Sequence, residues 1–271
     1  MIDQHTKLYG VVGYPIVHSL SPLIQNSALS AKRVNAVYLA FETEDITGCL
    51  KGMRSLDIKG LSVTIPYKTS VLPYLDEIDG LAEKIGAVNT IVNDNGRLIG
   101  YNTDAIGALR ALEEKIDLQD KTGLIIGAGG AARAIGFILK KNGVSISVAN
   151  RSEERGKDLA DALNCPFVPL ENIKGEDADI LVQTTSVGMH PHNDQCIVPE
   201  SVLKKDMAVM DIIYNPIETR LLKMAGEKSC LTINGLGMFI HQGAEQFRLW
   251  TGLEAPIDTM TRVVKEALEG E

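Results

Sequence analysis

The stretch TGLIIGAGGAARAIGFILKK, residues 122–141, decides the fold. Residues 122–126 are apolar enough to form a buried strand, and residues 131–141 have the apolar spacing of a helix, which Gly143 ends. Between them, the segment from Gly127 to Ala132 fits the pattern G-x-G-x-x-A. A strand that passes through a glycine-rich turn directly into a helix predicts the start of a βαβ unit.

This turn has the composition of a phosphate-binding loop. Gly127 permits the tight turn, Gly129 lets the backbone approach a pyrophosphate, and the small Ala132 allows the helix to pack closely on the strand. The helix N-terminus adds unpaired N–H groups and the positive end of its dipole. The alternative is a glycine-rich turn without a ligand. We expect a dinucleotide to contact the turn residues Gly127, Ala128, Gly129, Gly130 and Ala131.

The residues after the next strand, 144–149, indicate which dinucleotide binds. NAD enzymes usually place Asp or Glu there, roughly 20 residues beyond the turn, on the ribose 2′-hydroxyl. This chain has Asn150, Arg151 and Ser152, with Arg155 one helical turn further on. A neutral Asn does not repel a 2′-phosphate, and two guanidinium groups can hold one. The segment therefore favours NADP over NAD, against the alternative of ordinary surface arginines at a helix start.

Outward from this unit, apolar strands alternate with helices. Strands are expected at residues 180–183 and 208–212, a helix at 105–115 capped by Asp104, and helices from about 238 to 250 and from 258 onward. This alternation predicts an α/β protein with a doubly wound, Rossmann-type parallel sheet. The junctions near Asp104 and Gly237 are the expected domain boundaries.

The first third of the chain predicts a second α/β unit. It has strands at residues 9–13, 36–41 and 61–65, and a hairpin of 90–93 with 97–101 around an Asn-Gly turn. Ser21 is expected to cap a helix with Pro22 in its first turn. Polar residues at strand ends and turns are the substrate candidates: Ser19, Ser21, Thr64, Lys68, Asn89 and Asp104. Two hydroxyls beside a helix start suit a carboxylate, although each residue also has a plain structural interpretation as a cap or a surface side chain.

Bulk properties limit the classes of function. The net charge is −8 and the pI about 5.2, which argues against a nucleic-acid surface. The four cysteines are scattered without a Cys-x-x-Cys pair, so neither a zinc site nor a disulfide framework is expected. His190-Pro191-His192 supplies too few ligands for a metal site. With no signal peptide or membrane span recognised, a cytoplasmic protein is expected, as a monomer or homodimer.

Several motifs together resemble the shikimate dehydrogenase family. In chain order they are Ser19-Leu20-Ser21-Pro22, Val63-Thr64-Ile65-Pro66-Tyr67-Lys68, Gly86-Ala87-Val88-Asn89-Thr90, Gly100-Tyr101-Asn102-Thr103-Asp104, Gly127 to Ala131, Asn150-Arg151-Ser152, Tyr214-Asn215-Pro216 and Asn234-Gly235-Leu236-Gly237-Met238 followed by Gln242. The resemblance runs from Tyr9 to beyond Gln242, and its specificity lies in the whole ordered set. Tyr67 departs from the His that many relatives carry there.

The resemblance implies an NADP-dependent oxidoreductase that reduces 3-dehydroshikimate to shikimate, a step towards chorismate and aromatic amino acids. It implies that Ser19 and Ser21 hold the substrate carboxylate and that Tyr214 closes the pocket. Ring hydroxyls would be bound by Thr64, Lys68, Asn89, Asp104 and Gln242. Lys68 is the expected proton donor, oriented by Asp104. Ile212 and Gly235 would line the nicotinamide side.

The implied domains are 1–104, completed by 238–271, for the substrate, and 105–237 for NADP. The substrate domain is expected to have a mainly parallel sheet. Two alternatives stay open. One is a quinate/shikimate dehydrogenase that uses NAD, against which Asn150 argues. The other is a non-catalytic NADP-sensing protein of the same fold, against which the joint presence of Lys68, Asp104 and both serines argues.

Overall fold

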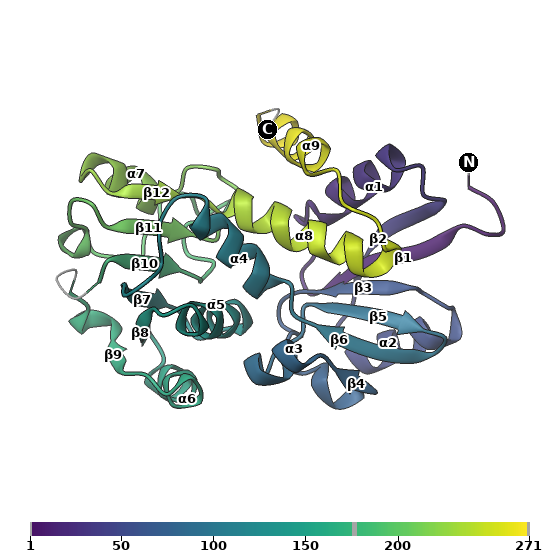
Figure 1. The fold of residues 1–271 in the computed structure, drawn as a ribbon, viewed down its shortest axis with the longest axis horizontal. Helices are drawn as coiled ribbons and strands as arrows, with labels where there is room; N and C mark the ends of the chain where they lie inside the picture. The colour runs from purple at the N-terminus through teal and green to yellow at the C-terminus, as the bar shows by residue number, and fades with distance from the viewer. Residues whose placement is uncertain (1, 175–177, 270–271) are drawn as a thin grey trace. The chain divides into compact units, whose positions relative to one another are not determined.

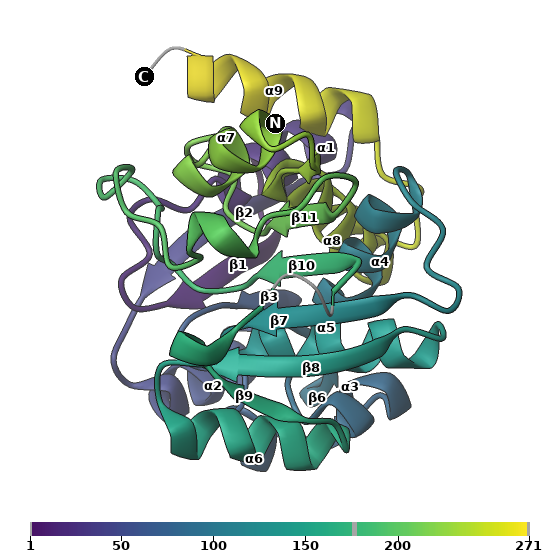
Figure 2. The same cartoon turned by 90° about the vertical axis from the view of Figure 1, so that its left-hand side faces the viewer.

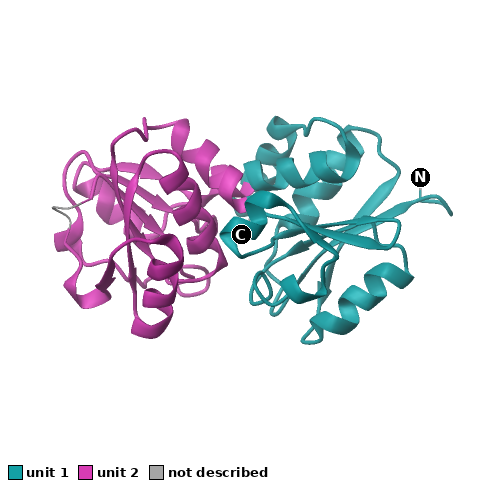
Figure 3. Cartoon of the chain, turned by 60° about the horizontal axis from the view of Figure 1, so that its bottom comes forward, with its two compact units in different colours: residues 1–103, 240–271 teal, residues 104–239 magenta. Residues whose placement is uncertain are grey.

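The computed structural model describes residues 2–174 and 178–269. The chain divides into two compact units: residues 1–103 with 240–271 form the first, and residues 104–239 form the second (Figure 3). The boundaries expected from the sequence were at 104 and 237. Which unit binds the substrate and which binds NADP stays a proposal.

The second unit contains an all-parallel sheet of six strands (Figures 1 and 2). They are β7 (Thr122–Ile126), β8 (Ser145–Asn150), β9 (Phe167–Pro169), β10 (Ile180–Gln183), β11 (Ala208–Asp211) and β12 (Leu231–Ile233). Their order is β12-β11-β10-β7-β8-β9. Counted from the glycine-rich strand, this is the 3-2-1-4-5-6 order of dinucleotide-binding folds. The Rossmann-type sheet predicted from residues 122–141 is therefore confirmed.

Helices cover both faces of this sheet. They are α4 (Asp104–Glu113), α5 (Gly130–Lys141), α6 (Glu153–Leu163) and α7 (Arg220–Glu227), with the 3-10 turns η2 (Leu170–Asn172) and η4 (Glu200–Val202). Alternate residues of β7 enter different cores. Ile125 packs with residues of α4, α5 and α6, whereas Leu124 and Ile126 pack with α7 and the segments before it. Because both faces are buried, the strands read as continuous apolar runs.

The first unit has a mixed six-stranded sheet in the order β2-β1-β3-β5-β6-β4 (Figure 1). Its strands are β1 (Lys7–Gly13), β2 (Ala36–Glu42), β3 (Gly60–Val63), β4 (Glu77–Ile78), β5 (Thr90–Asp94) and β6 (Arg97–Tyr101). The pairings of β1 with β2, β1 with β3, and β4 with β6 are parallel, whereas β5 runs antiparallel to β3 and β6. Asn95 and Gly96 both have positive φ, as the two-residue turn expected for the β5–β6 hairpin requires.

The helices of this unit are α1 (Ser21–Ala31), α2 (Ile46–Ser55), α3 (Gly80–Ile85) and α9 (Ile257–Glu269), with the turn η1 (Leu72–Tyr74). Helix α8 (Gly235–Thr251) contains the boundary between the two units. No helix among residues 2–174 and 178–269 is long and apolar enough to cross a membrane.

Several local predictions were wrong by a few residues. Asp104, expected as the cap of α4, is its first helical residue. Ser21 is not the cap of α1: the cap position is Leu20, with no side-chain cap bond, and Ser21 is the first helical residue. The hydroxyl of Ser19 instead accepts the Ser21 N–H at 3.3 Å. Strand β3 ends at Val63, before Ile65, and α4 ends at Glu113, before Lys115. Helix ends and short strand ends depend on single hydrogen bonds, which apolar spacing does not specify.

Candidate cofactor and substrate sites

The glycine-rich turn has a backbone that only glycine accommodates at its first position. Gly127 has φ +117°, and a Cβ atom built there would lie 2.4 Å from the Thr184 hydroxyl. Its N–H donates to the carbonyl of Ala149, which ties the turn to β8. Gly129, by contrast, is exposed and has nothing within 4 Å of a built Cβ. The turn is therefore packed tightly at Gly127 and open at Gly129, as a pyrophosphate requires.

Helix α5 begins directly after this open glycine. Gly129 is its cap residue and offers no side-chain cap bond, so the first N–H groups of α5 are available to an anion. Ala132 is fully buried against the sheet and confirms the packing reason for a small residue there. The carboxyl ends of β7 and β10 lie next to each other, which is where the strand order reverses and where such folds bind their ligands.

The residues expected to select NADP lie at the end of β8. The Asn150 amide donates to the carbonyl of Ser152 at 2.9 Å, and Ser152 caps α6. Arg151 and Arg155 are both exposed, and no ion pair joins either to another described residue. The neighbouring Glu153 is paired with Lys157 at 2.6 Å instead. Two exposed guanidinium groups beside a neutral Asn suit a 2′-phosphate.

Ile212 and Gly235 come together after β11 and β12. A Cβ built on Gly235 would lie 2.1 Å from the backbone oxygen of Ile212, so these two backbones touch only because residue 235 is glycine. The ring of Tyr214 stacks on Phe239, with centroids 4.3 Å apart. The structure thus joins Ile212 and Gly235, the residues expected at the nicotinamide side, and gives Tyr214 an aromatic partner on α8.

A buried carboxylate lies immediately before this segment. Asp211, which ends β11, is fully buried, and burial raises its pKa to about 6 against the opposing effect of its hydrogen bonds. It accepts from the Thr219 hydroxyl at 2.7 Å, and from the Ile213 N–H and the Gln183 amide at 3.2 Å each. Gln183 also donates to the carbonyls of Thr185 and Val187. These bonds tie the loop after β10 to the loop after β11.

In the first unit, the substrate candidates follow strands that end at one edge of the sheet. Ser19 lies in the loop after β1 and Ser21 is the first residue of α1, while Thr64 follows β3, the parallel neighbour of β1. The N–H of Thr64 donates to the carbonyl of Val12, and a Cβ built on Gly13 would lie 2.5 Å from the Thr64 methyl group. The ends of β1 and β3 are therefore in contact.

Asn89 and Lys68 are attached to the same edge. The carbonyl of Asn89 accepts the N–H of Val63 at 2.7 Å, because β5 begins where the antiparallel β3 ends. The carbonyl of Lys68 accepts the N–H of Val88 at the same distance. Asn89 is buried and Lys68 half-buried. The structure thus brings Thr64, Lys68 and Asn89 onto adjoining segments.

Gln242 lies on helix α8, which contacts both α1 and the residue before β5. The carbonyl of the next residue, Gly243, accepts the amide of Gln25 on α1 at 2.9 Å. One turn later, the Gln246 amide reaches the carbonyl of Asn89 at 3.3 Å. The buried Gln242 therefore lies on a helix held between α1 and β5. Asp104, also buried, is the first residue of the second unit, and its pairing with Lys68 stays a prediction.

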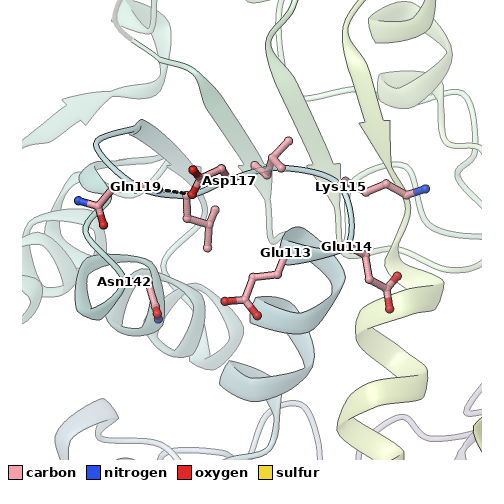
Figure 4. Close-up of a pocket in the computed structure, with 8 residues that line it drawn as sticks. Glu113, Glu114, Lys115, Asp117, Gln119 and Asn142 are labelled. Atoms are coloured by element: carbon pink, nitrogen blue, oxygen red, sulfur yellow. Dashed lines mark hydrogen bonds between the residues drawn. The ribbon is translucent and has the colours of Figure 1, made fainter.

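A separate hollow of about 590 Å³ in the second unit is lined by residues 113–119 and Asn142. Figure 4 shows Glu113 and Glu114 at the end of α4 and Asn142 just after α5. These segments precede β7 and β8, so the hollow lies at the edge of the sheet opposite Gly127. Its exposed acidic side chains do not suit a phosphate. No group of three metal-ligating side chains was found among the described residues.

Two contributors were not predicted from the sequence. The Thr184 hydroxyl donates to the carbonyl of Ile126 at 2.7 Å and lies directly behind Gly127. Its position after a buried strand at the switch point was the available signal. The second contributor, Gln246, gave no signal, because one more glutamine in an amphipathic helix is unremarkable without knowledge of its partners.

Comparisons with known proteins identify the family. Residues 11–91 match the shikimate dehydrogenase substrate binding domain, residues 109–227 match shikimate / quinate 5-dehydrogenase, and residues 235–265 match the shikimate 5′-dehydrogenase C-terminal domain. The shikimate dehydrogenase (NADP(+)) of Methanocaldococcus jannaschii is 46% identical, with 97% of this chain and 98% of that protein covered. The chain belongs to the shikimate dehydrogenase family.

Solved structures of shikimate dehydrogenases have the same fold. One crystal structure, in complex with NADP+, is 45% identical and superimposes with a TM-score of 0.93, covering 99% of this chain and 98% of that one. The Thermus thermophilus enzyme, in complex with NADP(H) and shikimate, is 38% identical with a TM-score of 0.90, covering 97% of this chain and 100% of that one. The family resemblance inferred from the ordered motifs is confirmed.

Proposed function

We propose that this chain is an NADP-dependent shikimate dehydrogenase, which catalyses the reversible reduction of 3-dehydroshikimate to shikimate. The observation that carries the proposal is the family membership over nearly the whole chain, with relatives named shikimate dehydrogenase (NADP(+)) at 44–47% identity. Both sets of site residues support it: the open glycine-rich turn of the second unit and the hydroxyl, amide and lysine side chains at one sheet edge of the first.

The cofactor is NADP. The open space in front of Gly129 and the unpaired start of α5 accommodate its pyrophosphate. Arg151 and Arg155 bind the 2′-phosphate, and Asn150 in place of an acid removes the repulsion that would favour NAD. Ile212 and Gly235, whose backbones touch, line the nicotinamide. Bound NADPH supplies hydride to the substrate carbonyl; binding and orientation are the protein's contribution.

The substrate residues have distinct roles. The hydroxyls of Ser19 and Ser21, beside the start of α1, bind the carboxylate. Thr64, Asn89 and Gln242 hold the ring hydroxyls. Tyr214, supported by Phe239, closes the pocket over the substrate.

Lys68 completes the reaction by transferring the proton. When the carbonyl becomes an alkoxide, the Lys68 ammonium donates a proton to that oxygen, and in the reverse direction the amine accepts it. The Asp104 carboxylate orients the ammonium and hydrogen-bonds the same hydroxyl. Because the half-buried Lys68 is fixed through its own carbonyl to Val88, its backbone position is set by the β3–β5 edge.

Initial rates with each combination of substrate and cofactor test the proposal. The purified chain is assayed with shikimate or quinate and with NADP or NAD, and the absorbance of the reduced nicotinamide is followed. Shikimate with NADP is expected to give the highest kcat/KM. A preference for quinate or NAD would favour the quinate/shikimate alternative, and NADP binding without turnover of either substrate would favour the sensing protein.

A further inference from the structure

Arg133 is the fourth residue of α5, the helix that follows the glycine-rich turn. It is half-buried, and within residues 2–174 and 178–269 its side chain makes no hydrogen bond or ion pair. Arg54, the other half-buried arginine, donates to the carboxylate of Asp76 and to the carbonyl of Tyr74. Because a guanidinium group that is partly withdrawn from water is usually paired, Arg133 is a candidate to bind an anion from outside the chain.

The start of α5 is an unfavourable place for a cation in the protein alone. The first N–H groups of a helix carry the positive end of its dipole, and acidic residues are preferred there. Helix α6 follows this rule with Glu153 and Glu154, and α9 follows it with Asp258. Helix α5 has no acidic residue in its first turn and no side-chain cap, and Arg133 lies at the end of that turn. An anion bound at Gly129 would offset both the dipole and the guanidinium charge.

Helix geometry directs Arg133 towards the glycine-rich turn. Side chains in a helix tilt towards its N-terminus, and each covers the surface of the preceding turn. The residues three and four positions before Arg133 are Gly130 and Gly129, which have no side chains. A Cβ built on Gly129 would have nothing within 4 Å. No side chain at these two positions therefore separates Arg133 from the open space at Gly129, and residues so spaced are neighbours on the helix surface.

We propose that Arg133 binds the pyrophosphate of NADP, as a third arginine of the cofactor site beside Arg151 and Arg155. This inference rests on the cofactor assignment within the proposed function. The arginines have different tasks. Arg151 and Arg155, which follow β8, bind the 2′-phosphate, whereas Arg133 binds the pyrophosphate at the start of α5. Arg133 thus contributes affinity for the dinucleotide and takes no part in the recognition of the 2′-phosphate.

The substitution Arg133→Gln tests the proposal, because it removes the charge and keeps a flexible polar side chain. Isothermal titration calorimetry measures binding of NADP+ and of adenosine 2′-monophosphate, which has the 2′-phosphate but lacks the pyrophosphate. We expect the dissociation constant of NADP+ to rise about 10- to 150-fold, the effect of one charge-assisted hydrogen bond. The dissociation constant of adenosine 2′-monophosphate should stay unchanged. Arg151→Ala should instead weaken the binding of both ligands.

Arg110→Gln is the matched control. Arg110 is an exposed arginine on α4 of the same unit, and its removal changes the net charge by the same amount. This variant should bind NADP+ like the wild type. If the loss of one positive charge anywhere in the unit were sufficient, both variants would bind NADP+ equally weakly. Arg133→Lys, which restores the charge but not the planar fork of donors, should recover part of the affinity.

A second measurement, made without any dinucleotide, separates binding from a structural role. If Arg133 only packed against its neighbours, Arg133→Gln would lower the melting temperature of the ligand-free chain. The proposal predicts a melting temperature at or above that of the wild type, because the substitution removes a cation from the positive end of the helix dipole. At one fixed concentration, NADP+ should then raise the melting temperature less in the variant than in the wild type.

The outcomes separate this inference from the proposed function. A wild-type chain that binds NADP+ without oxidising shikimate contradicts the proposed function alone, and a wild type that does not bind NADP+ contradicts both. Three results with Arg133→Gln contradict the inference alone: an unchanged affinity for NADP+, an equal loss of affinity for NADP+ and adenosine 2′-monophosphate, or a ligand-free chain that melts below the wild type or does not fold.

Discussion

The residues proposed to bind the cofactor and those proposed to bind the substrate act through different groups, backbone in the first case and side chains in the second. In the second unit, the cofactor residues act mainly through backbone: Gly127 permits a turn at φ +117°, Gly129 leaves open space, and Gly235 lets two backbones touch. In the first unit, the substrate residues act through side chains such as Thr64 and Asn89. The Asn89 side chain is held by further buried hydrogen bonds rather than by a local motif.

This difference has consequences for both recognition and robustness. A site formed by backbone groups is encoded by consecutive residues, so it can be recognised from a short pattern. Only a few glycine positions in it are intolerant of substitution. A side-chain site depends on long-range contacts, such as that between Gln246 and Asn89, which are 157 positions apart. Its members are therefore sensitive to changes in residues that never touch the ligand.

The largest effect is expected in the side-chain site, at the proton donor. Lys68→Ala should lower kcat about 10²- to 10⁴-fold, the usual contribution of general acid–base catalysis, while NADP still binds. Steady-state kinetics over wide ranges of shikimate and NADP measure this, with circular dichroism to verify folding. A kcat near the wild-type value at saturating shikimate would remove Lys68 from the chemistry.

The next largest effect is expected in the cofactor site, and it should appear only in the KM for NADP. Arg151→Ala should raise the KM for NADP about 10- to 150-fold, because a charge-assisted contact is worth roughly 1.5–3 kcal/mol. The KM for shikimate should change little. Arg262→Ala, which removes an exposed arginine paired with Glu266 on α9, is the control. If both arginine variants bind NADP like the wild type, the 2′-phosphate is held elsewhere.

Asp211 tests how the loops near the nicotinamide residues are held. Its pKa is raised from 3.8 to about 6, so the folded protein takes up this proton more readily than the unfolded chain. The stability that this group contributes is fully present below pH 4 and is lost as the pH rises through about 6.

Relative to Asp211→Asn, the wild type should therefore lose between about 1 and 3 kcal/mol of unfolding free energy from pH 4 to pH 7. Urea titrations of both proteins across this range give the difference. If the difference between the two proteins is the same at every pH, Asp211 does not titrate in this way.

The smallest effects are expected for the carboxylate serines. Ser19→Ala and Ser21→Ala should each raise the KM for shikimate about 2- to 12-fold and leave the KM for NADP unchanged. Because the Ser21 hydroxyl does not cap α1 but hydrogen-bonds the buried Tyr38 hydroxyl, its removal should lower the melting temperature more than Ser30→Ala, an exposed change on the same helix. Unaltered shikimate affinity in the Ser19, Ser21 double variant would put the carboxylate at another place.

Much of the fold could be predicted because its elements carry local signals. Residues 122–141 identified β7, the turn and α5, and Asn95-Gly96 identified the β5–β6 hairpin. The misassigned cap at Ser21 has a tertiary cause. The loop before α1 is closed by Ser19, whose hydroxyl accepts the Ser21 N–H, and no periodicity encodes that bond.

The substrate site was less predictable. The ordered motifs nominated Thr64, Lys68, Asn89 and Gln242, but the adjoining positions of the segments that carry the first three follow from the pairing of β1, β3 and β5, which the sequence does not specify. Gln246 and Thr184 were missed because they support other residues. A supporting side chain is defined by its partners, and its own residue type carries little information.

The most direct test of the central claim is the initial rate of the wild-type chain with shikimate and NADP, with the product identified by mass spectrometry. The account predicts saturable formation of NADPH and of 3-dehydroshikimate in equal amounts, and loss of nearly all of this rate in Lys68→Ala. A folded wild-type chain that binds NADP but forms no 3-dehydroshikimate from shikimate would contradict it.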